Sequence, residues 1–244
     1  MNALLKQTLS PARSPCGGLA VRLAGEACVL RCSGALHVAG PDVLVVADLH
    51  LEKGSAFAVR GQMLPPYDTA ATLMRLEAEI AAVRPRAVIL LGDSFHDRAA
   101  VPRLSPDDRA RLYRIAQGRD WLWLEGNHDR EALAADAPDL PGRVTGDRPL
   151  GGLFLTHEPS AGTGAAGEVA GHLHPAVRVA AYGRGVRRPC FITDGRRIIL
   201  PAFGAFTGGL NVRDPAIAGL FGTPPLIAAL GRDKVHAVTW EKAV

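Results

Sequence analysis

Runs of apolar residues recur along the first half of the chain, each about the length of one strand. Residues 43–47, 87–91 and 121–124 are almost wholly apolar and lack the alternation of a strand with one face in water. Such runs are typical of strands that are buried on both faces in an α/β protein. We therefore predict three buried strands in these segments.

Two segments between and after these runs carry helical signals. In residues 66–83, leucine and isoleucine recur at intervals of three and four, and the pattern ends before Pro85. The second helix is predicted to begin after Ser105, a residue type that caps helices well, with Pro106 in the first turn and two aspartates behind it. We expect it to run to about Gln117, because Gly118 then closes it.

The second half of the chain predicts short strands that follow one another directly. The predicted segments are 153–155, 168–170, 177–182, 190–193, 197–200 and 235–240. Near the start, residues 1–26 are expected to be loosely structured, and residues 27–38 to form a first strand or a hairpin. Early strands alternating with helices, followed by strands alone, predict an α/β fold with two mixed β-sheets flanked by helices. We find no repeat or linker and expect one domain over residues 1–244.

Five short polar motifs stand in a fixed order, and four of them directly follow an apolar run. They are Asp48-Leu49-His50, Gly92-Asp93, Gly126-Asn127-His128-Asp129, Thr156-His157 and Gly171-His172-Leu173-His174. Strand ends are the rigid positions from which an α/β sheet presents reactive groups, so these side chains are expected to meet.

The residue types in the motifs indicate a metal site. Asp and Asn offer oxygen and His offers nitrogen, whereas no cysteine lies in any motif. This mixed set suits Mn, Fe, Zn or Ni better than a structural zinc site. Seven or more ligands are too many for one tetrahedral ion, but they suit two ions about 3.5–4 Å apart that share a carboxylate. The chemistry implied is in-line displacement at phosphorus by a metal-activated hydroxide.

The ordered motifs resemble the signature of the binuclear metallophosphoesterase, or calcineurin-like, superfamily. The resemblance implies a four-layer αββα sandwich and seven metal ligands: Asp48, His50 and His174 for the first ion, Asn127, His157 and His172 for the second, and Asp93 as the bridge. His128 matches the histidine that binds no metal and stabilises the transition state or protonates the leaving oxygen.

Three longer strings resemble the ligase-associated DNA-damage-response endonuclease family, at residues 48–54, 92–97 and 201–209. This narrower resemblance implies a metal-dependent phosphodiesterase that cleaves DNA, with single strands preferred. It also implies a role in DNA repair and a functional association with a DNA ligase and a helicase. We expect two Mn²⁺ ions, with Fe, Zn or Ni as alternatives.

Composition adds a basic character to this picture. The formal net charge is +4, and 24 of the 28 basic residues are arginine. The guanidinium fork suits phosphate recognition, although a GC-rich genome explains the excess as readily. The four cysteines form no zinc or disulfide pattern, and no run approaches the roughly 18 apolar residues of a membrane span. We therefore expect a cytoplasmic protein with no membrane contact.

Several single residues near the motifs have two interpretations. His96 is expected to face the site as a second catalytic residue that contacts the phosphate or the leaving group; the alternative is a turn histidine at the sheet edge. Arg184, Arg187 and Arg188 are expected to form a loop that tracks phosphates, rather than a solvated face. Glu52 is expected either to hold a ligand histidine in its tautomer or to be a surface acid.

Other residues have weaker functional signals. For Arg109, Arg111 and Arg114 we expect a solvated helix face. His37 and His236 are expected to be surface or structural histidines. The glycines of 201–209 serve either tight turns or a close approach of the backbone to the site.

Three functions compete on the sequence alone. A DNA phosphodiesterase is favoured by the longer strings and the arginine excess. A small-molecule phosphodiesterase or nucleotide pyrophosphatase would use the same metal site on another substrate. A non-catalytic scaffold predicts eroded motifs, whereas all five motifs are complete.

Overall fold

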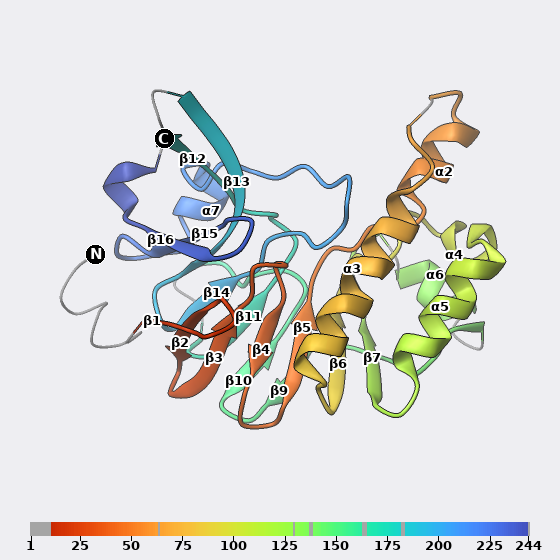
Figure 1. Ribbon diagram of the computed structural model, residues 1–244, viewed down its shortest axis with the longest axis horizontal. Coiled ribbons are helices and arrows are strands. Elements are labelled where there is room, and N and C mark those ends of the chain that lie inside the picture. The colour runs from red at the N-terminus through yellow and green to blue at the C-terminus, as the bar shows by residue number, and fades with distance from the viewer. Residues whose placement is uncertain are drawn as a thin grey trace.

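Two eight-stranded β-sheets pack face to face, with helices over their outer faces (Figure 1). This computed structural model describes residues 11–62, 64–128, 130–136, 139–162, 165–181 and 184–243. The first sheet contains, in spatial order, β1 (Ala12–Arg13), β2 (Leu19–Leu23), β3 (Glu26–Leu30), β4 (Leu36–Val38), β5 (Val43–Val46), β6 (Ala87–Leu91), β7 (Asp120–Leu124) and β8 (Arg143–Thr145). Strands β1 to β5 pair antiparallel and β5 to β8 pair parallel.

The second sheet is also mixed. Its order is β16 (Val235–Val238), β15 (Leu226–Leu230), β13 (Arg184–Thr193), β14 (Arg197–Ile199), β11 (Glu168–Ala170), β10 (Leu153–Leu155) and β9 (Arg148–Leu150), with β12 (Ala176–Ala181) paired to β13. Strand β11 lies parallel to both β10 and β14, whereas the other pairs are antiparallel.

Helices cover the outer face of each sheet. The helices are α2 (Lys53–Val59), α3 (Asp68–Val83), α4 (Ala100–Arg103), α5 (Pro106–Ala116), α6 (Arg130–Asp136) and α7 (Pro215–Ala218), and a 3₁₀ turn spans Trp240–Lys242. In Figure 1, α3 and α5 lie beside each other along the first sheet. The predicted sandwich of two mixed sheets flanked by helices is therefore confirmed.

The continuous apolar runs are explained by the two faces of strand β5. Val43 and Val45 pack into the core between the sheets, whereas Leu44 and Val46 pack under the helices. Both faces are therefore dry, and no polar position can alternate with the apolar ones. A third core lies between the second sheet and α7, where Ile217 is fully buried.

One sequence prediction about these elements needs correction, several elements were not predicted, and two predicted ranges extend beyond the described residues. Residues 19–26 are not loosely structured, because Leu19–Leu23 forms β2, whose alternate residues enter the core between the sheets. The elements that were not predicted include β8, β9, β15, α2, α4, α6 and α7. Residues 1–10 and Tyr182, the last residue of a predicted strand, lie outside the described part. One domain over residues 1–244 stays a prediction.

Candidate metal centre

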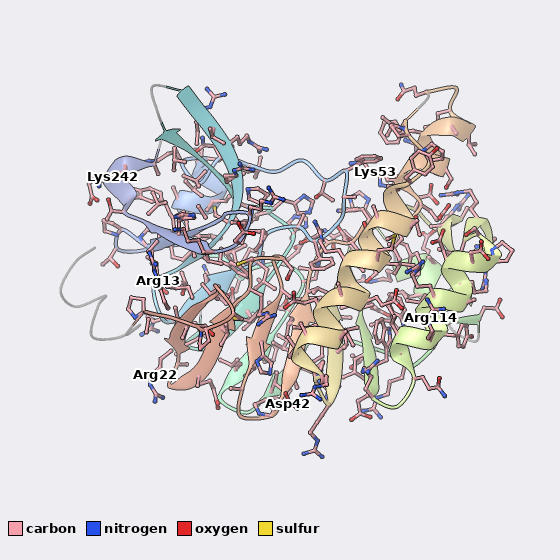
Figure 2. The ribbon with its side chains drawn as sticks, in the orientation of Figure 1. Arg13, Arg22, Asp42, Lys53, Arg114 and Lys242 are labelled. Atoms are coloured by element: carbon pink, nitrogen blue, oxygen red, sulfur yellow. The ribbon has the colours of Figure 1, made fainter. Side chains whose placement is uncertain are left out.

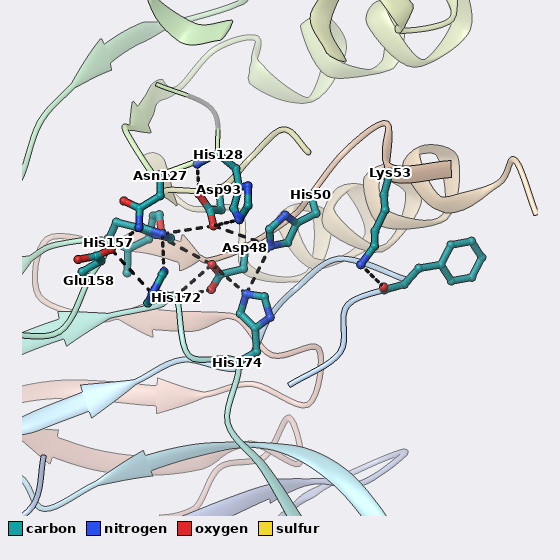
Figure 3. A network of polar contacts seen from close by, with 12 residues as sticks. Asp48, His50, Lys53, Asp93, Asn127, His128, His157, Glu158, His172 and His174 are labelled. Carbon is teal, nitrogen blue, oxygen red and sulfur yellow. Dashed lines mark hydrogen bonds and ion pairs between the residues drawn. The ribbon is translucent and has the colours of Figure 1, made fainter. Parts of the chain in front are cut away.

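The polar motifs meet where strands of both sheets end. Asp48, Asp93 and Asn127 follow β5, β6 and β7, three neighbouring parallel strands of the first sheet. The second sheet contributes three histidines from the segments after β10 and β11: His157, His172 and His174. Figure 3 shows all these side chains converging on one centre. Asp129, the last residue of its motif, lies outside the described residues.

A first cluster consists of Asp48, His50 and His174, whose ligand atoms lie within 4.8 Å of one another. Asp48 is fully buried, and its Oδ1 lies 3.2 Å from Nε2 of His174. The Nε2 atoms of His50 and His174 lie 3.4 Å apart. The carboxylate is held in place by the backbone N–H of His172, which donates to both of its oxygens.

A second cluster consists of Asp93, His157 and His172, also within 4.8 Å of one another. His157 Nε2 lies 3.4 Å from Asp93 Oδ2 and 3.3 Å from His172 Nδ1. The other nitrogen of His157, Nδ1, lies 3.1 Å from the carbonyl oxygen of Leu91. Donation to that carbonyl leaves the Nε2 lone pair facing the cluster, the arrangement typical of a metal-binding histidine.

The donor atoms of both clusters fit two divalent cations. Two buried carboxylates and four imidazoles provide oxygen and nitrogen donors without any thiolate. In each cluster two imidazole nitrogens approach to 3.3–3.4 Å, and a cation that both nitrogens share would satisfy their lone pairs. His50 Nε2 also lies 4.0 Å from Asp93 Oδ2, so Asp93 stands between the two clusters.

The ionisation of these groups is strongly shifted by their surroundings. Burial, with the neighbouring His174, lowers the pKa of His50 to about 3. Burial acts to raise the pKa of Asp93, but the hydrogen bond with His157 outweighs it and holds that pKa well below the usual range. Burial acts to lower the pKa of His157, yet the same bond to Asp93 raises it to about 9. Asp93 is thus ionised and His50 neutral, the states in which each can bind a cation, whereas His157 would release a proton on binding one.

The backbone of the centre adopts an uncommon conformation. Five of the six clustered residues have a positive φ: Asp48 (56°), His50 (45°), Asp93 (48°), His172 (66°) and His174 (46°). Such positions persist only where the surrounding structure enforces them, and they concentrate at functional sites. Gly92 (φ 74°) has a related role, because a Cβ there would lie 2.2 Å from His157 Nδ1.

Asn127, His128 and Glu158 lie at the open side of the centre. The side-chain amide nitrogen of Asn127 donates to the carboxylate of Glu158. This bond orients the amide and leaves the amide oxygen of Asn127 available as a ligand. His128 donates its backbone N–H to Asp93 Oδ1 at 3.0 Å, and its ring Nε2 lies 3.9 Å from Asp93 Oδ2. The His128 side chain is 56% exposed, so its ring is open to an incoming molecule. Glu158 was missed from the sequence, where its only signal is that it follows His157.

A cavity of about 610 Å³ lies beside these residues. His96, Asn127 and His128 line it, as do Arg60, Arg98 and Arg130 and the acidic Asp97 and Glu131. The ring of His96 lies 6.0 Å from that of His50 and 6.3 Å from that of His128. Burial and the nearby Lys53 lower its pKa. His96 therefore faces the site, as expected.

The arginines singled out in the sequence do not line this cavity. Arg111 and Arg114 on α5 form ion pairs with Glu77 on α3, so their face joins two helices. Arg114 lies well away from Lys53 (Figure 2). Residues 184–188 belong to strand β13 and not to a loop, and Arg187 donates to the carbonyl of Gly209. The side chain of Arg184 is outside the described part. The three cavity arginines were missed from the sequence, where the only signal is that Arg98 and Arg130 directly follow the strings 92–97 and 126–129.

Glu52 and His37 have structural partners. Glu52 is buried and accepts hydrogen bonds from Ser55 and Thr69, which tie α2 to α3, so it is not a surface acid, and among the described contacts it has no bond to a ligand histidine. His37 pairs with Asp42 at 3.0 Å, as a structural histidine. His236 lies exposed on β16. Within the described residues, no helix is both long and apolar enough to cross a bilayer.

Comparison with known proteins identifies the family. The crystal structure of nuclease MPE from Pseudomonas putida is similar, with 30% identity, a TM-score of 0.69 and coverage of 91% of this chain and 100% of that chain. Yfce, a phosphoesterase from E. coli, is 17% identical with a TM-score of 0.41 and covers 81% of this chain and 98% of that one. No curated protein sequence matches. The calcineurin-like phosphoesterase family matches residues 41–176, which contain all five motifs, and the chain therefore belongs to that family.

Proposed function

We propose that this phosphoesterase is a two-metal phosphodiesterase that cleaves DNA and prefers single strands. The observation that carries the proposal is the cavity of about 610 Å³ beside the metal clusters, with Arg60, Arg98 and Arg130 in its wall. Arginine is well suited to phosphate oxygens, and three arginines outnumber the two acids there. The similarity to a nuclease at 30% identity favours the same substrate class.

In this proposal the clustered residues hold two divalent cations, for which we expect Mn²⁺. The first ion is held by Asp48, His50 and His174, and the second by His157 and His172. From the family resemblance we add Asn127 as a ligand of the second ion and Asp93 as the bridge. When bound, such a pair lowers the pKa of a water molecule and neutralises charge on the phosphoryl oxygens.

The residues that bind no metal have separate roles. His128 presents an exposed ring at the cavity and is placed to give a proton to the leaving oxygen. His96, whose ring lies 6.3 Å from that of His128, would contact the non-bridging phosphate oxygens or the leaving group. Because a single strand bends into the centre more cheaply than a stacked duplex, single strands are the preferred substrate. We further infer, from the resemblance at 48–54, 92–97 and 201–209, a repair role in the cytoplasm alongside a DNA ligase and a helicase.

The main test compares three substrates in manganese: a single-stranded oligonucleotide, its duplex and an aryl phosphodiester. We expect the single strand to be cleaved faster than the duplex. Cleavage should weaken steeply with salt, because bound counterions are released when arginines contact phosphates. A cavity of this volume would also hold a nucleotide. Hydrolysis of the aryl diester without cleavage of any DNA would therefore favour the small-molecule alternative.

The cavity arginines give this test a matched pair of variants. Removing Arg98, whose side chain is 80% exposed, should reduce the salt dependence of single-strand binding by about 0.7 in the slope of log K against log salt. Arg114→Ala removes the same charge on α5 and should leave that slope unchanged. Equal slopes for the two variants would argue against a phosphate contact at Arg98.

The bridging role of Asp93 is tested by counting ions. At saturating manganese the native chain should bind two ions, whereas Asp93→Ala should bind fewer and lose most of its activity. Asp107→Ala, at an exposed position in the first turn of α5, is the control and should bind two. A native chain that binds a single ion under these conditions would contradict the two-metal proposal.

A further inference from the structure

Phe206 is a large apolar side chain left 39% exposed beside the metal centre. It lies in the segment 204–209, which connects strand β14 with α7 and belongs to neither. Single exposed apolar side chains are common on protein surfaces, so what distinguishes this ring is the segment that carries it, which contacts residues of the site. The inference below rests on the proposed DNA substrate and extends it.

Both ends of this segment are fixed against metal-binding candidates. The backbone N–H of Gly204 donates to the carbonyl of Asp48 at 3.1 Å. At the other end, a Cβ on Gly209 would lie 2.1 Å from the carbonyl oxygen of His174. Two residues of chain span at most about 7 Å, so the Cα of Phe206 lies within about that distance of Gly204, the residue that contacts the backbone of Asp48.

The middle of the segment is held as well. Ala205 donates its N–H to Thr72 Oγ1 of α3 at 3.0 Å, and Thr207 Oγ1 donates to the carbonyl of Gly204 at 2.8 Å. An exposed ring on a mobile loop would lose its freedom when it binds a ligand, which weakens binding. Here the backbone that carries the ring is already ordered.

Lys53 links Phe206 to the cavity. Its Nζ donates to the carbonyl of Phe206 at 3.0 Å, across from His50 and His174 (Figure 3). The charge of Lys53 also acts on His96, which lines the cavity. A cation therefore contacts the backbone that carries the exposed ring and also acts on a residue of the arginine-lined cavity, so Lys53 could bind a phosphate of a strand that extends from the cavity toward the ring.

We propose that Phe206 is a stacking platform for one base of the single strand, next to the phosphate that is cut. Proteins that bind single strands combine a basic path with aromatic rings on which bases stack, whatever the base. The bases of a duplex are already stacked on one another and are not free to leave their partners. A platform here would therefore add to the preference for single strands and tolerate any sequence.

The test uses oligonucleotides in which one base is removed. A single abasic site is moved through the positions on each side of the cut, and KM and kcat are measured for the native protein, Phe206→Ala and Phe206→Trp. With the intact oligonucleotide, Phe206→Ala should raise KM by about 5- to 100-fold and change kcat far less. In the native protein, an abasic site at the stacked position should raise KM similarly.

The decisive result is the combination of the two changes. In Phe206→Ala, the abasic site at that position should have no further effect, whereas Phe206→Trp should restore the native pattern. Tyr113→Ala, which removes an exposed ring from α5, should behave as the native protein at every position. A loss of structure in Phe206→Ala would lower kcat/KM wherever the abasic site is placed. Phe206→Leu repeats the test with a side chain that keeps the apolar volume but has no ring.

Two outcomes would overturn the inference and are distinguishable from failure of the proposed function. If the native protein cuts single strands and no abasic position changes KM, no base is stacked near the cut. If Phe206→Ala and Phe206→Leu both keep the native KM, the ring is not the platform. If the native protein hydrolyses the aryl diester and cuts no DNA, the DNA substrate itself is wrong.

Discussion

At the scale of single residues, a substitution of His128 can test the chemical step without disturbing metal binding. Its backbone N–H holds Asp93, whereas its ring is exposed at the cavity. Because a side-chain substitution keeps the backbone contact, His128→Ala should retain both metals. General acid catalysis typically raises the rate of the chemical step by about 10²–10⁴-fold, so kcat on DNA should fall by about that factor.

The leaving group distinguishes how His128 acts. A nitrophenolate leaving group needs little protonation, so the loss of kcat should shrink on an aryl phosphodiester. An equal loss on both substrates would indicate electrostatic stabilisation in place of proton donation. Loss of a metal ion, measured in the same preparation, would mean that His128 is a ligand.

Gly92 is a residue whose missing side chain matters. A Cβ there would collide with the His157 ring at 2.2 Å, whereas Gly118 has a similar φ of 77° and open space around it. Alanine at Gly118 should therefore cost only the strain of its backbone, about 1–2 kcal/mol of unfolding free energy. Alanine at Gly92 should add displacement of His157 and reduce the number of bound ions. Denaturant unfolding measures the two stabilities, and metal analysis counts the bound ions. If both variants bind the same number of ions, Gly92 is not needed to position His157.

The residues found from the sequence differ in kind from those that were missed. Asp48 or His172 could be predicted because each belongs to an ordered motif at a strand end. Arg98 directly follows the string 92–97 and Phe206 lies within the string 201–209, yet neither belongs to an ordered motif. Their roles could not be predicted, because the cavity and the exposure of the ring exist only in the folded chain.

At the scale of elements, helix α5 was predicted from its own capping signals. Ser105 accepts a hydrogen bond from the Asp108 N–H at 3.1 Å, and Pro106 occupies the first turn. Ser105→Ala should lower the free energy of unfolding by about 0.5–2 kcal/mol, and Ser105→Asp should restore most of it. Because the helix carries no site residue, kcat and KM should stay unchanged. A change in activity larger than the change in stability would show that α5 contacts the site.

Elements without local signals were predicted less well. Strands β5, β6 and β7 were predicted because burial on both faces leaves a continuous apolar run. Strand β2 carries only a short local signal, three alternating apolar residues, in a region whose prolines and glycines favour a loop; its pairing with β3 supplies the rest of its order. A pattern within one segment predicts the element, whereas pairing with a distant partner depends on the whole chain.

At the scale of the whole molecule, the metal centre lies where the two sheets meet. The first sheet supplies Asp48 and Asp93, and the second supplies the segments carrying His157, His172 and His174. Ala47 pairs with Ala202 at the same edge, so backbone contacts join the sheets there. Cations held by both sheets would stabilise their packing, because unfolding would separate the ligands.

Metal binding should therefore raise the stability of the whole domain. At a free metal concentration of 100 times Kd, one site adds about 2.7 kcal/mol, which corresponds to a rise in the unfolding temperature of roughly 5–10 °C for a chain of this size. Chelation should lower the unfolding temperature and added manganese should restore it, as measured by calorimetry. Arg98→Ala should keep this response, since Arg98 lines only the cavity, whereas Asp93→Ala should lose most of it. The Asp93→Ala variant lacks the carboxylate between the clusters, so a cation cannot join the two sheets through that side chain. If manganese raised the unfolding temperature of this variant as much as that of the native protein, the cation would stabilise the chain at some other place.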